Sequence, residues 1–69
     1  MIEPLSKREQ EILGLICEAC SNREIAGQLV ITVSAVKKHT GNIYGKLNVN
    51  SRTQAIARAR RLGLLSVDG

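Results

Sequence analysis

The sequence predicts an all-α fold, a four-helix bundle that contains a helix-turn-helix. The chain has 69 residues, with one Tyr and neither Phe nor Trp. A β-sandwich core needs aromatic and β-branched runs, whereas the Leu, Ile, Val and Ala found here favour packed helices. Three sequence signatures of helix starts divide the chain. Because 69 residues are within the ordinary size of one domain, residues 1–69 are expected to form a single domain.

The first two helices are expected over about residues 7–19 and 22–29. Ser6-Lys7-Arg8-Glu9 is a capping box, in which the Ser hydroxyl accepts from the backbone N–H of the Glu, and the Glu reaches back. Apolar residues then recur at Ile12, Leu13 and Ile16, which gives the first helix one apolar face. Ser21-Asn22-Arg23-Glu24 repeats the capping box and opens the second helix.

The third and fourth helices are expected over about residues 33–47 and 52–62. Thr32 is the candidate N-cap of the third helix, and Ser51-Arg52-Thr53-Gln54 is a third capping box. Gly63 suits the end of the fourth helix. The inward face of the third helix is expected to consist of Val33, Val36, Thr40, Ile43 and Leu47. Since the second and third helices are neighbours joined by a short turn, they form the helix-turn-helix.

Charge is distributed unevenly along the chain. The net charge is +4, yet residues 1–32 carry a net −2, while residues 33–61 hold seven basic residues and no acid. Such asymmetry is typical of a protein that binds a polyanion. The plainer interpretation is a solvated basic face, as many small domains have.

No metal site, cofactor site or active site is expected. Cys17 and Cys20 form a C-x-x-C pair, but a zinc site needs about four ligands and His39 is the single His. The βαβ setting of a thioredoxin-like site is also missing, so both Cys are interpreted as small apolar residues. No titratable pair suits acid–base or nucleophilic work, which argues against an enzyme. No apolar run approaches ~18 residues and no signal peptide is recognisable, so no membrane association and a cytoplasmic location are expected.

The outward face of the third helix is the candidate binding surface. Stepping 100° per residue from the inward face gives the outward residues Ser34, Lys38, Gly41, Asn42 and Gly45. A small, polar ridge with basic flanks fits a groove walled by phosphates, where Lys and Asn can bond to base edges. Each mid-helix Gly costs ~1 kcal/mol relative to Ala. Three explanations would account for the two glycines, Gly41 and Gly45: close approach to DNA, close approach of another helix, or simple tolerance.

The chain resembles the LuxR/GerE-type helix-turn-helix domain from Leu5 to about Leu65. The segments that carry the resemblance are L-S-K-R-E at 5–9, S-N-R-E-I-A at 21–26, V-K-K-H at 36–39, N-I-Y-G-K-L at 42–47 and S-R-T-Q-A at 51–55. These segments resemble most the C-terminal domain of large ATP-binding, MalT-like transcriptional regulators. Two-component response regulators are the second most similar group. The resemblance implies a DNA-binding output domain, excised from the C-terminus of a larger regulator, whose third helix enters the major groove.

Residue roles follow from the outward face together with this resemblance. Base contacts are expected from Lys38, Asn42 and Gly41. Phosphate contacts are expected from Thr32, Ser34, Lys37, His39, Lys46 and Arg52. The fourth helix commonly supplies the dimer contact in this family, which suggests weak self-association through Ala55, Ile56, Ala59 and Leu62. The implied partners are double-stranded DNA, a second copy of the chain and RNA polymerase.

Three positions depart from the usual family pattern. Ala19 stands where a Gly usually ends the first helix, and a left-handed backbone there would cost Ala ~1 kcal/mol. Ala35 replaces a usual Thr, and Gly41 stands where response regulators often have a long polar side chain. The third departure weakens the case for base reading at position 41.

Other function classes stay open at this point. A promoter-reading sigma-factor region shares part of the pattern, although His39 and the basic fourth helix favour the LuxR/GerE type. A basic protein-interaction module that binds an acidic partner is the alternative from a different class. An RNA-binding module would lack a stacking platform, because the chain is almost free of aromatic residues.

Overall fold

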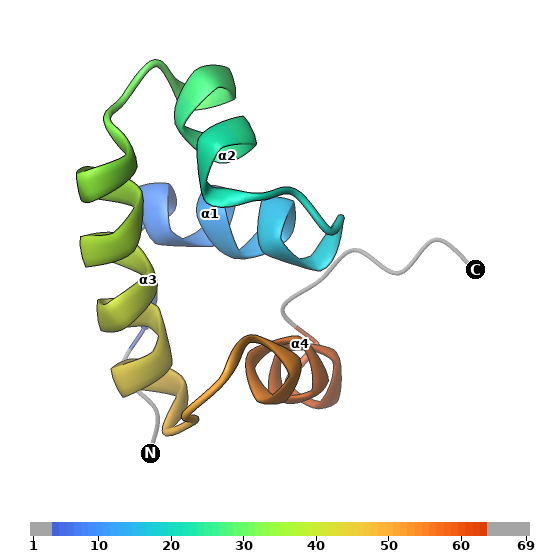
Figure 1. The fold of residues 1–69 in the computed structure, drawn as a ribbon. Coiled ribbons are helices and arrows are strands. Elements are labelled where there is room, and N and C mark those ends of the chain that lie inside the picture. The colour runs from blue at the N-terminus through green and yellow to red at the C-terminus, as the bar shows by residue number, and fades with distance from the viewer. Residues whose placement is uncertain (1–3, 64–69) are drawn as a thin grey trace.

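The computed structural model describes residues 4–63, in which four helices and no strand occur (Figure 1). The helices are α1 (Lys7–Cys17), α2 (Asn22–Leu29), α3 (Val33–Leu47) and α4 (Arg52–Arg61). The all-α prediction is confirmed, and α2 and α3 begin and end at the predicted residues. In the described part of the chain, no helix is long and apolar enough to cross a membrane.

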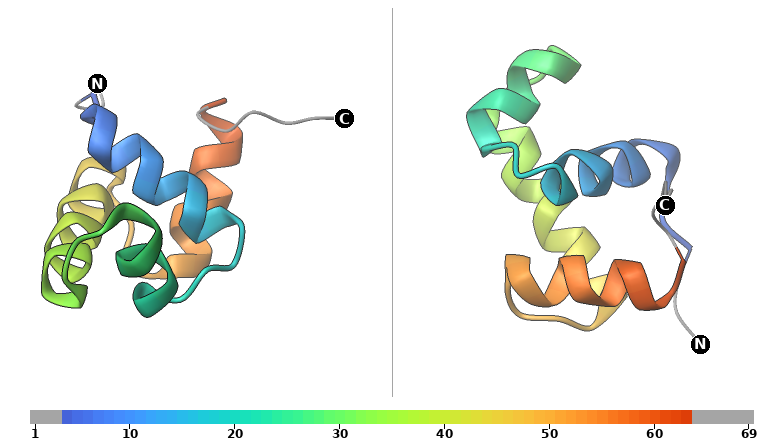
Figure 2. Two further views of the ribbon diagram at one scale, coloured as in Figure 1. Left: turned by 90° about the horizontal axis from the view of Figure 1, so that it is seen from above. Right: turned by 90° about the vertical axis from the view of Figure 1, so that its right-hand side faces the viewer.

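Helix α3 is the centre of the arrangement, because it packs against each of the other three helices. Helices α2 and α4 lie toward opposite ends of α3 and do not contact each other (Figure 1). Helix α1 lies beside α4, and both cross α3 (Figure 2). This packing leaves one long side of α3 uncovered.

All four helices contribute apolar side chains to one core. Its buried members are Ile12, Leu13, Ile16, Ile25, Ala26, Val36, Ile43, Leu47, Ala55 and Ala59. Of the predicted inward face of α3, Val36, Ile43 and Leu47 are fully buried, while Val33 is half-buried. The half-buried Thr40 satisfies its hydroxyl by donating to the Val36 carbonyl at 2.8 Å. The helical spacing therefore identified the inward face of α3 correctly.

The N-termini of the helices are fixed by the predicted caps, with one difference. Ser6 and Glu9 form a complete capping box, with hydrogen bonds of 3.1 and 2.9 Å. Ser21 and Glu24 form the second at 3.1 and 2.7 Å. At α4, Ser51 accepts from the N–H of Gln54, but the Gln54 amide oxygen accepts from Asn50 instead of from Ser51. The third predicted capping box is therefore only half formed.

Each helix is followed by a residue in the left-handed backbone region. These residues are Ala19 (φ 67°), Val30 (φ 56°), Asn48 (φ 58°) and Gly63 (φ 69°). After α1, the N–H of Ala19 donates to Ile16 and the N–H of Cys20 donates to Leu15, which is a Schellman motif. This motif ends α1 at Cys17, two residues before the predicted end. Helix α4 ends one residue before its predicted end.

Candidate nucleic-acid interface

The uncovered side of α3 carries the residues that the sequence placed there. Ser34, Lys38, Gly41, Asn42 and Gly45 are all exposed. They lie on the side of the helix opposite the buried Val36, Ile43 and Leu47, and we call them the α3 ridge. Lys37, on the flank of the ridge, is exposed as well. The geometry therefore brings two lysines, one amide and three small residues onto one helix face.

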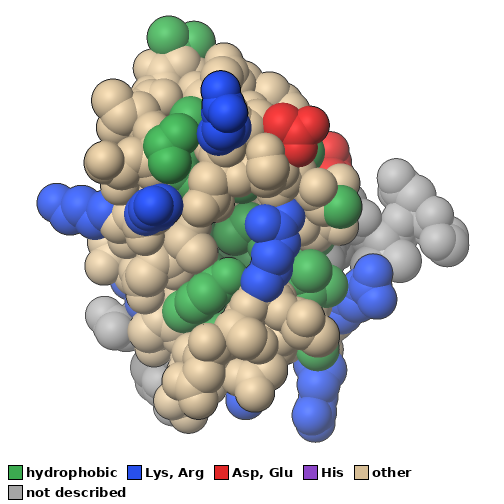
Figure 3. Space-filling view, viewed as in Figure 1, with side chains coloured by type: hydrophobic (Ala, Val, Ile, Leu, Met, Phe, Trp, Pro, Cys, Tyr) green, Lys and Arg blue, Asp and Glu red, His purple; other side chains and the backbone are tan. Residues whose placement is uncertain are grey.

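The basic side chains of this face are not neutralised within the described chain. Among residues 4–63 the ion pairs are Arg8–Glu11 at 3.6 Å and Lys46–Glu9 at 2.7 Å, so Lys37 and Lys38 have no carboxylate partner there. Figure 3 shows basic side chains over α3, while the acidic side chains visible on this face gather away from it. On the face shown, the acidic side chains do not lie over α3.

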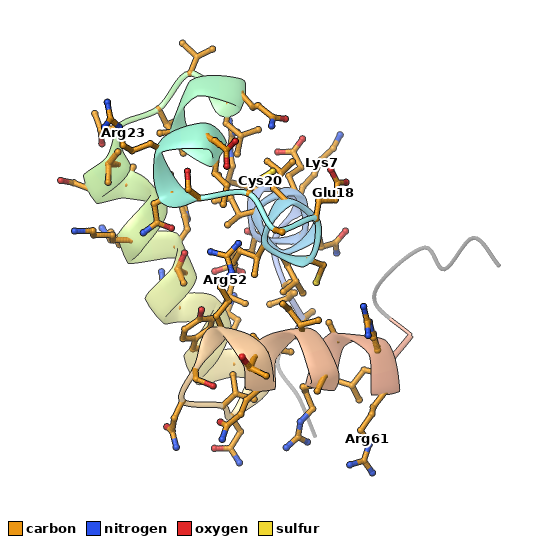
Figure 4. All side chains as sticks on the ribbon, turned by 45° about the vertical axis from the view of Figure 1, so that its right-hand side comes forward. Lys7, Glu18, Cys20, Arg23, Arg52 and Arg61 are labelled. Atoms are coloured by element: carbon orange, nitrogen blue, oxygen red, sulfur yellow. The ribbon has the colours of Figure 1, made fainter. Side chains whose placement is uncertain are left out.

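Arg23 adds a basic residue that the sequence analysis did not single out. It is exposed in the first turn of α2, and its side chain lies beside the N-terminal part of α3 (Figure 4). The helix-turn-helix geometry places the two together, since Val30, Ile31 and Thr32 turn the chain back from α2 into α3. The sequence signal that could have identified Arg23 is its position as a basic residue in the first turn of the helix that precedes α3.

The N-terminus of α3 is open to an anion. Helices α1 and α2 each carry a Glu in the first turn, and hydrogen bonds from Ser21 lower the pKa of Glu24. Helix α3 has no acid there, although its N-cap Thr32 accepts from the N–H of Ala35 at 3.0 Å. Its free N–H groups and positive dipole end favour a phosphate. The exposed hydroxyls of Thr32 and Ser34 lie at this end.

The two glycines of the ridge are not required by packing within the described chain. A Cβ atom added at Gly41 or Gly45 would meet no atom within 4 Å. Neither glycine has a positive φ, so neither is needed for the backbone conformation. The structure therefore rules out close approach of another described helix as their explanation. Close approach to a partner and simple tolerance are the explanations that remain.

Lys46, a predicted phosphate contact, forms an ion pair within the domain. Its ammonium group lies 2.7 Å from Oε1 of Glu9, and its side chain is 25% exposed. It also donates to the Pro4 carbonyl at 3.4 Å. The ion pair with Lys46, followed by the hydrogen bond from the Ser6 backbone, lowers the pKa of Glu9. Since its charge is already paired within the domain, we do not include Lys46 among the phosphate contacts proposed below.

Arg52 is likewise engaged inside the molecule. Its guanidinium donates to the carbonyl of Ile16 at 3.2 Å and also to the carbonyl of Cys20. These carbonyls belong to the end of α1 and the turn after it, so Arg52 fastens the start of α4 to α1 (Figure 4). A cation at a helix C-terminus also interacts favourably with the helix dipole. The contacts within the domain give Arg52 this structural role, and we do not include it among the phosphate contacts proposed below.

The predicted dimer contact is reduced by burial. Ala55 and Ala59 are 0% exposed and belong to the core, so neither can touch a second copy. Ile56 is half-buried against the core, whereas Leu62 is 42% exposed. The periodicity found the apolar face of α4 correctly, but most of that face packs inward.

The remaining residues named in the sequence analysis are His39 and the two cysteines. His39 is half-buried on the flank of the ridge, next to the exposed Lys38. Cys17 and Cys20 are free and half-buried, and burial raises the pKa of the Cys17 thiol, which opposes thiolate formation. Within the described residues, no three His, Cys, Asp or Glu side chains gather as metal ligands.

Comparison with known proteins now identifies the family. The model for bacterial regulatory proteins of the luxR family matches residues 3–59. The chain belongs to the luxR family. This assignment confirms the LuxR/GerE-type helix-turn-helix domain expected from the sequence, the DNA-binding domain of transcriptional regulators, and it decides against the sigma-factor alternative. The match includes the helix-turn-helix and most of α4.

Individual relatives agree with the assignment. The chain is 50% identical over 64 residues to the transcriptional regulatory protein LiaR of Bacillus subtilis (strain 168), covering 93% of the chain and 30% of LiaR. It is 44% identical over 59 residues to the HTH-type transcriptional regulator MalT of Yersinia enterocolitica, covering 86% of the chain and 6% of MalT. The chain therefore spans only a small part of these curated relatives. The MalT match supports the expected likeness to MalT-like regulators.

Solved structures share the fold. The transcription factor GerE superposes with a TM-score of 0.84 at 42% identity, covering 93% of this chain and 96% of GerE. The response regulator ChrA, of a heme-sensing two-component system, superposes with a TM-score of 0.86 at 45% identity, covering 90% of this chain and 31% of ChrA. The four helices thus have the arrangement of a luxR-family helix-turn-helix.

Proposed function

We propose that the domain binds double-stranded DNA sequence-specifically, with α3 in the major groove, as the output domain of a bacterial transcriptional regulator. The observation that carries the proposal is the α3 ridge, which is exposed and free of acid. Lys38 on the ridge and Lys37 on its flank have no carboxylate partner in residues 4–63. A helix with small outward residues can lie deep in a groove about 12 Å wide. The membership of the chain in the luxR family supports the same function.

The residues divide into base contacts and phosphate contacts. Lys38 and Asn42 lie one turn apart on the ridge, where Lys can bond to guanine and Asn to adenine. Lys37, His39 and Arg23 flank the ridge and suit phosphates on either side of the groove. Thr32 and Ser34 stand at the open N-terminus of α3, where a phosphate oxygen can accept from backbone N–H and hydroxyl groups. Gly41 contributes close approach of the backbone in place of a side-chain contact.

Selection from a pool of random-sequence duplexes tests this function directly. We expect a common motif to emerge, and the affinity of the domain for it to fall steeply between about 50 and 200 mM salt. The log–log slope should be about −3, because Arg23, Lys37 and Lys38 are three cationic contacts. Lys37→Gln should reduce that slope by about one unit. Lys7→Gln on α1 removes the same charge far from the ridge and should leave the slope unchanged. Recovery of no common motif would contradict sequence-specific binding.

We further propose that two copies meet on DNA through the exposed end of α4. Leu62 and the edge of Ile56 are the apolar groups available there, and so small a contact favours a monomer in dilute solution. Footprints should show two half-sites about one helical turn apart. Leu62→Gln should weaken cooperative binding to the double site and leave binding to a single half-site unchanged. Sedimentation that shows a tight dimer of the free domain would overturn the weak association.

The proposed role is regulatory and non-enzymatic. A DNA-binding regulator acts where bacterial DNA and RNA polymerase are, so we propose a cytoplasmic location and an effect on polymerase at the bound promoter. Transcription from a template that carries the selected motif, with and without the domain, tests whether polymerase is affected. Equal transcription in both cases would leave DNA binding as the sole activity of this segment.

A further inference from the structure

The end of the molecule opposite α2 carries a groove that the α3 ridge does not include. One wall consists of Asn48 and Val49, the two residues that follow α3. One face of α4 forms the other wall, with Gln54, Ala57, Arg58 and Arg61. The volume of the groove is about 400 Å³, which is within the range of ligand sites in proteins.

The groove has a defined chemistry. Gln54, Arg58 and Arg61 follow one another at i, i+4 and i+7, so they line a single face of α4. The small Ala57 lies between them and leaves room for a ligand. Val49 adds an apolar side chain, and the amides of Asn48 and Gln54 can donate to a peptide carbonyl. The charges of Arg58 and Arg61 therefore lie beside the small Ala57 and the apolar Val49.

The two arginines are not needed to hold the fold. Helix α4 is anchored by the buried Ala55 and Ala59 and by the hydrogen bonds of Arg52 to the end of α1. Within residues 4–63, neither Arg58 nor Arg61 forms an ion pair. Arg61 projects away from the other three helices (Figure 4). Two like charges one turn apart oppose each other, so their placement is unfavourable until an anion lies between them.

We propose that this groove binds an acidic segment of another protein, one that presents two carboxylates about one helical turn apart. Arginine binds carboxylates through two parallel hydrogen bonds, and two arginines at i and i+3 match carboxylates of similar spacing. The apolar Val49 and Ala57 favour a peptide over a phosphate backbone. The proposal is independent of DNA binding.

A peptide titration tests the proposal with the full chain. The probe is a short, labelled helical peptide with two glutamates one turn apart, and its counterpart carries glutamines at those positions. We expect the acidic peptide alone to bind, and amide signals of the groove residues to shift in heteronuclear NMR spectra. R58Q/R61Q should weaken binding about tenfold, because charged hydrogen bonds are lost. K7Q/R60Q removes the same charge outside the groove and should change binding less than about twofold.

Three results would overturn the proposal. The first is equal weakening by both double variants, because it would show attraction to net charge alone. The second is no binding of the acidic peptide at concentrations up to about 1 mM. The third is an unchanged peptide affinity together with a reduced salt slope for DNA in R58Q/R61Q, which would make the groove a phosphate contact. Thermal unfolding of each variant checks that its substitutions leave the fold intact.

Discussion

The ammonium group of Lys46 lies 2.7 Å from Oε1 of Glu9 and joins the last turn of α3 to the first turn of α1. The same carboxylate accepts the backbone N–H of Ser6 at 2.9 Å, so one group both caps α1 and pairs with α3. Glu9 is 5% exposed, and it is the one buried charged residue among those described. The pair therefore links the C-terminal end of α3 to the N-terminal end of α1.

Lys46→Met should destabilise the domain without altering its electrostatic attraction to DNA. The substitution leaves Glu9 buried without its cation, and we expect a loss of about 2 kcal/mol in the free energy of unfolding at neutral pH. Urea unfolding measures this loss, with Lys7→Met as the exposed control. The salt slope for DNA binding should be the same as in the wild type. A slope reduced by about one unit would restore the original phosphate assignment.

The stabilisation by this pair should also depend on pH. The pKa of Glu9 is lowered in the folded state, so its contribution is fully present above the ordinary glutamate pKa of about 4.3. The contribution is lost as the pH falls through the lower folded-state value. The difference in stability between the wild type and Lys46→Met should therefore shrink in acid. A difference that stayed constant from pH 7 into acid would show that packing of the lysine stem dominates.

Ala19→Gly should stabilise the domain. Ala19 is exposed and has a φ of 67°, so its Cβ gains no packing while it strains the left-handed turn after α1. We expect a gain of about 1 kcal/mol in the free energy of unfolding. Ala57→Gly is the matched control, because it lies exposed within α4 and should lose about 1 kcal/mol. Destabilisation by both substitutions would mean that the turn tolerates alanine.

Gly41→Ala should separate stability from binding. Nothing lies within 4 Å of the added Cβ, so the free energy of unfolding should rise by about 1 kcal/mol. If α3 lies deep in the groove, the methyl group meets DNA, and affinity for the selected site should fall about tenfold. Gly14→Ala in α1 also has free space and should stabilise the fold with no effect on binding. Unchanged affinity in Gly41→Ala would favour simple tolerance of the glycine.

Lys38→Ala distinguishes base reading from charge. A base contact should cost about 1–3 kcal/mol on the selected site and little on a scrambled duplex. A contact that serves only as charge should cost the same on both. Titration of wild type and variant against the two duplexes at one salt concentration measures the difference. Lys37→Ala, on the flank, is the companion variant that we expect to weaken both duplexes equally.

The sequence by itself determined the local features of the domain. Capping signals set the starts of all four helices, and helical spacing set the buried side of α3 and, with it, the exposed ridge. These features depend on residues three or four apart, whose geometry in a helix is fixed by the backbone. The left-handed turn at Ala19 is different, because only the family resemblance, in which a glycine usually stands there, pointed to it.

Tertiary structure alone decided the roles of the charged and apolar residues that lie at helix crossings. Lys46 reaches Glu9 across 37 residues, and Arg52 reaches the end of α1 across 36 residues. Ala55 and Ala59 are buried because α1 and α3 cover that face of α4. A basic residue on a helix flank has the same sequence signature whether it meets a phosphate or a carboxylate. Which of the two it meets depends on the helix that packs beside it, and helical spacing carries no information about that neighbour.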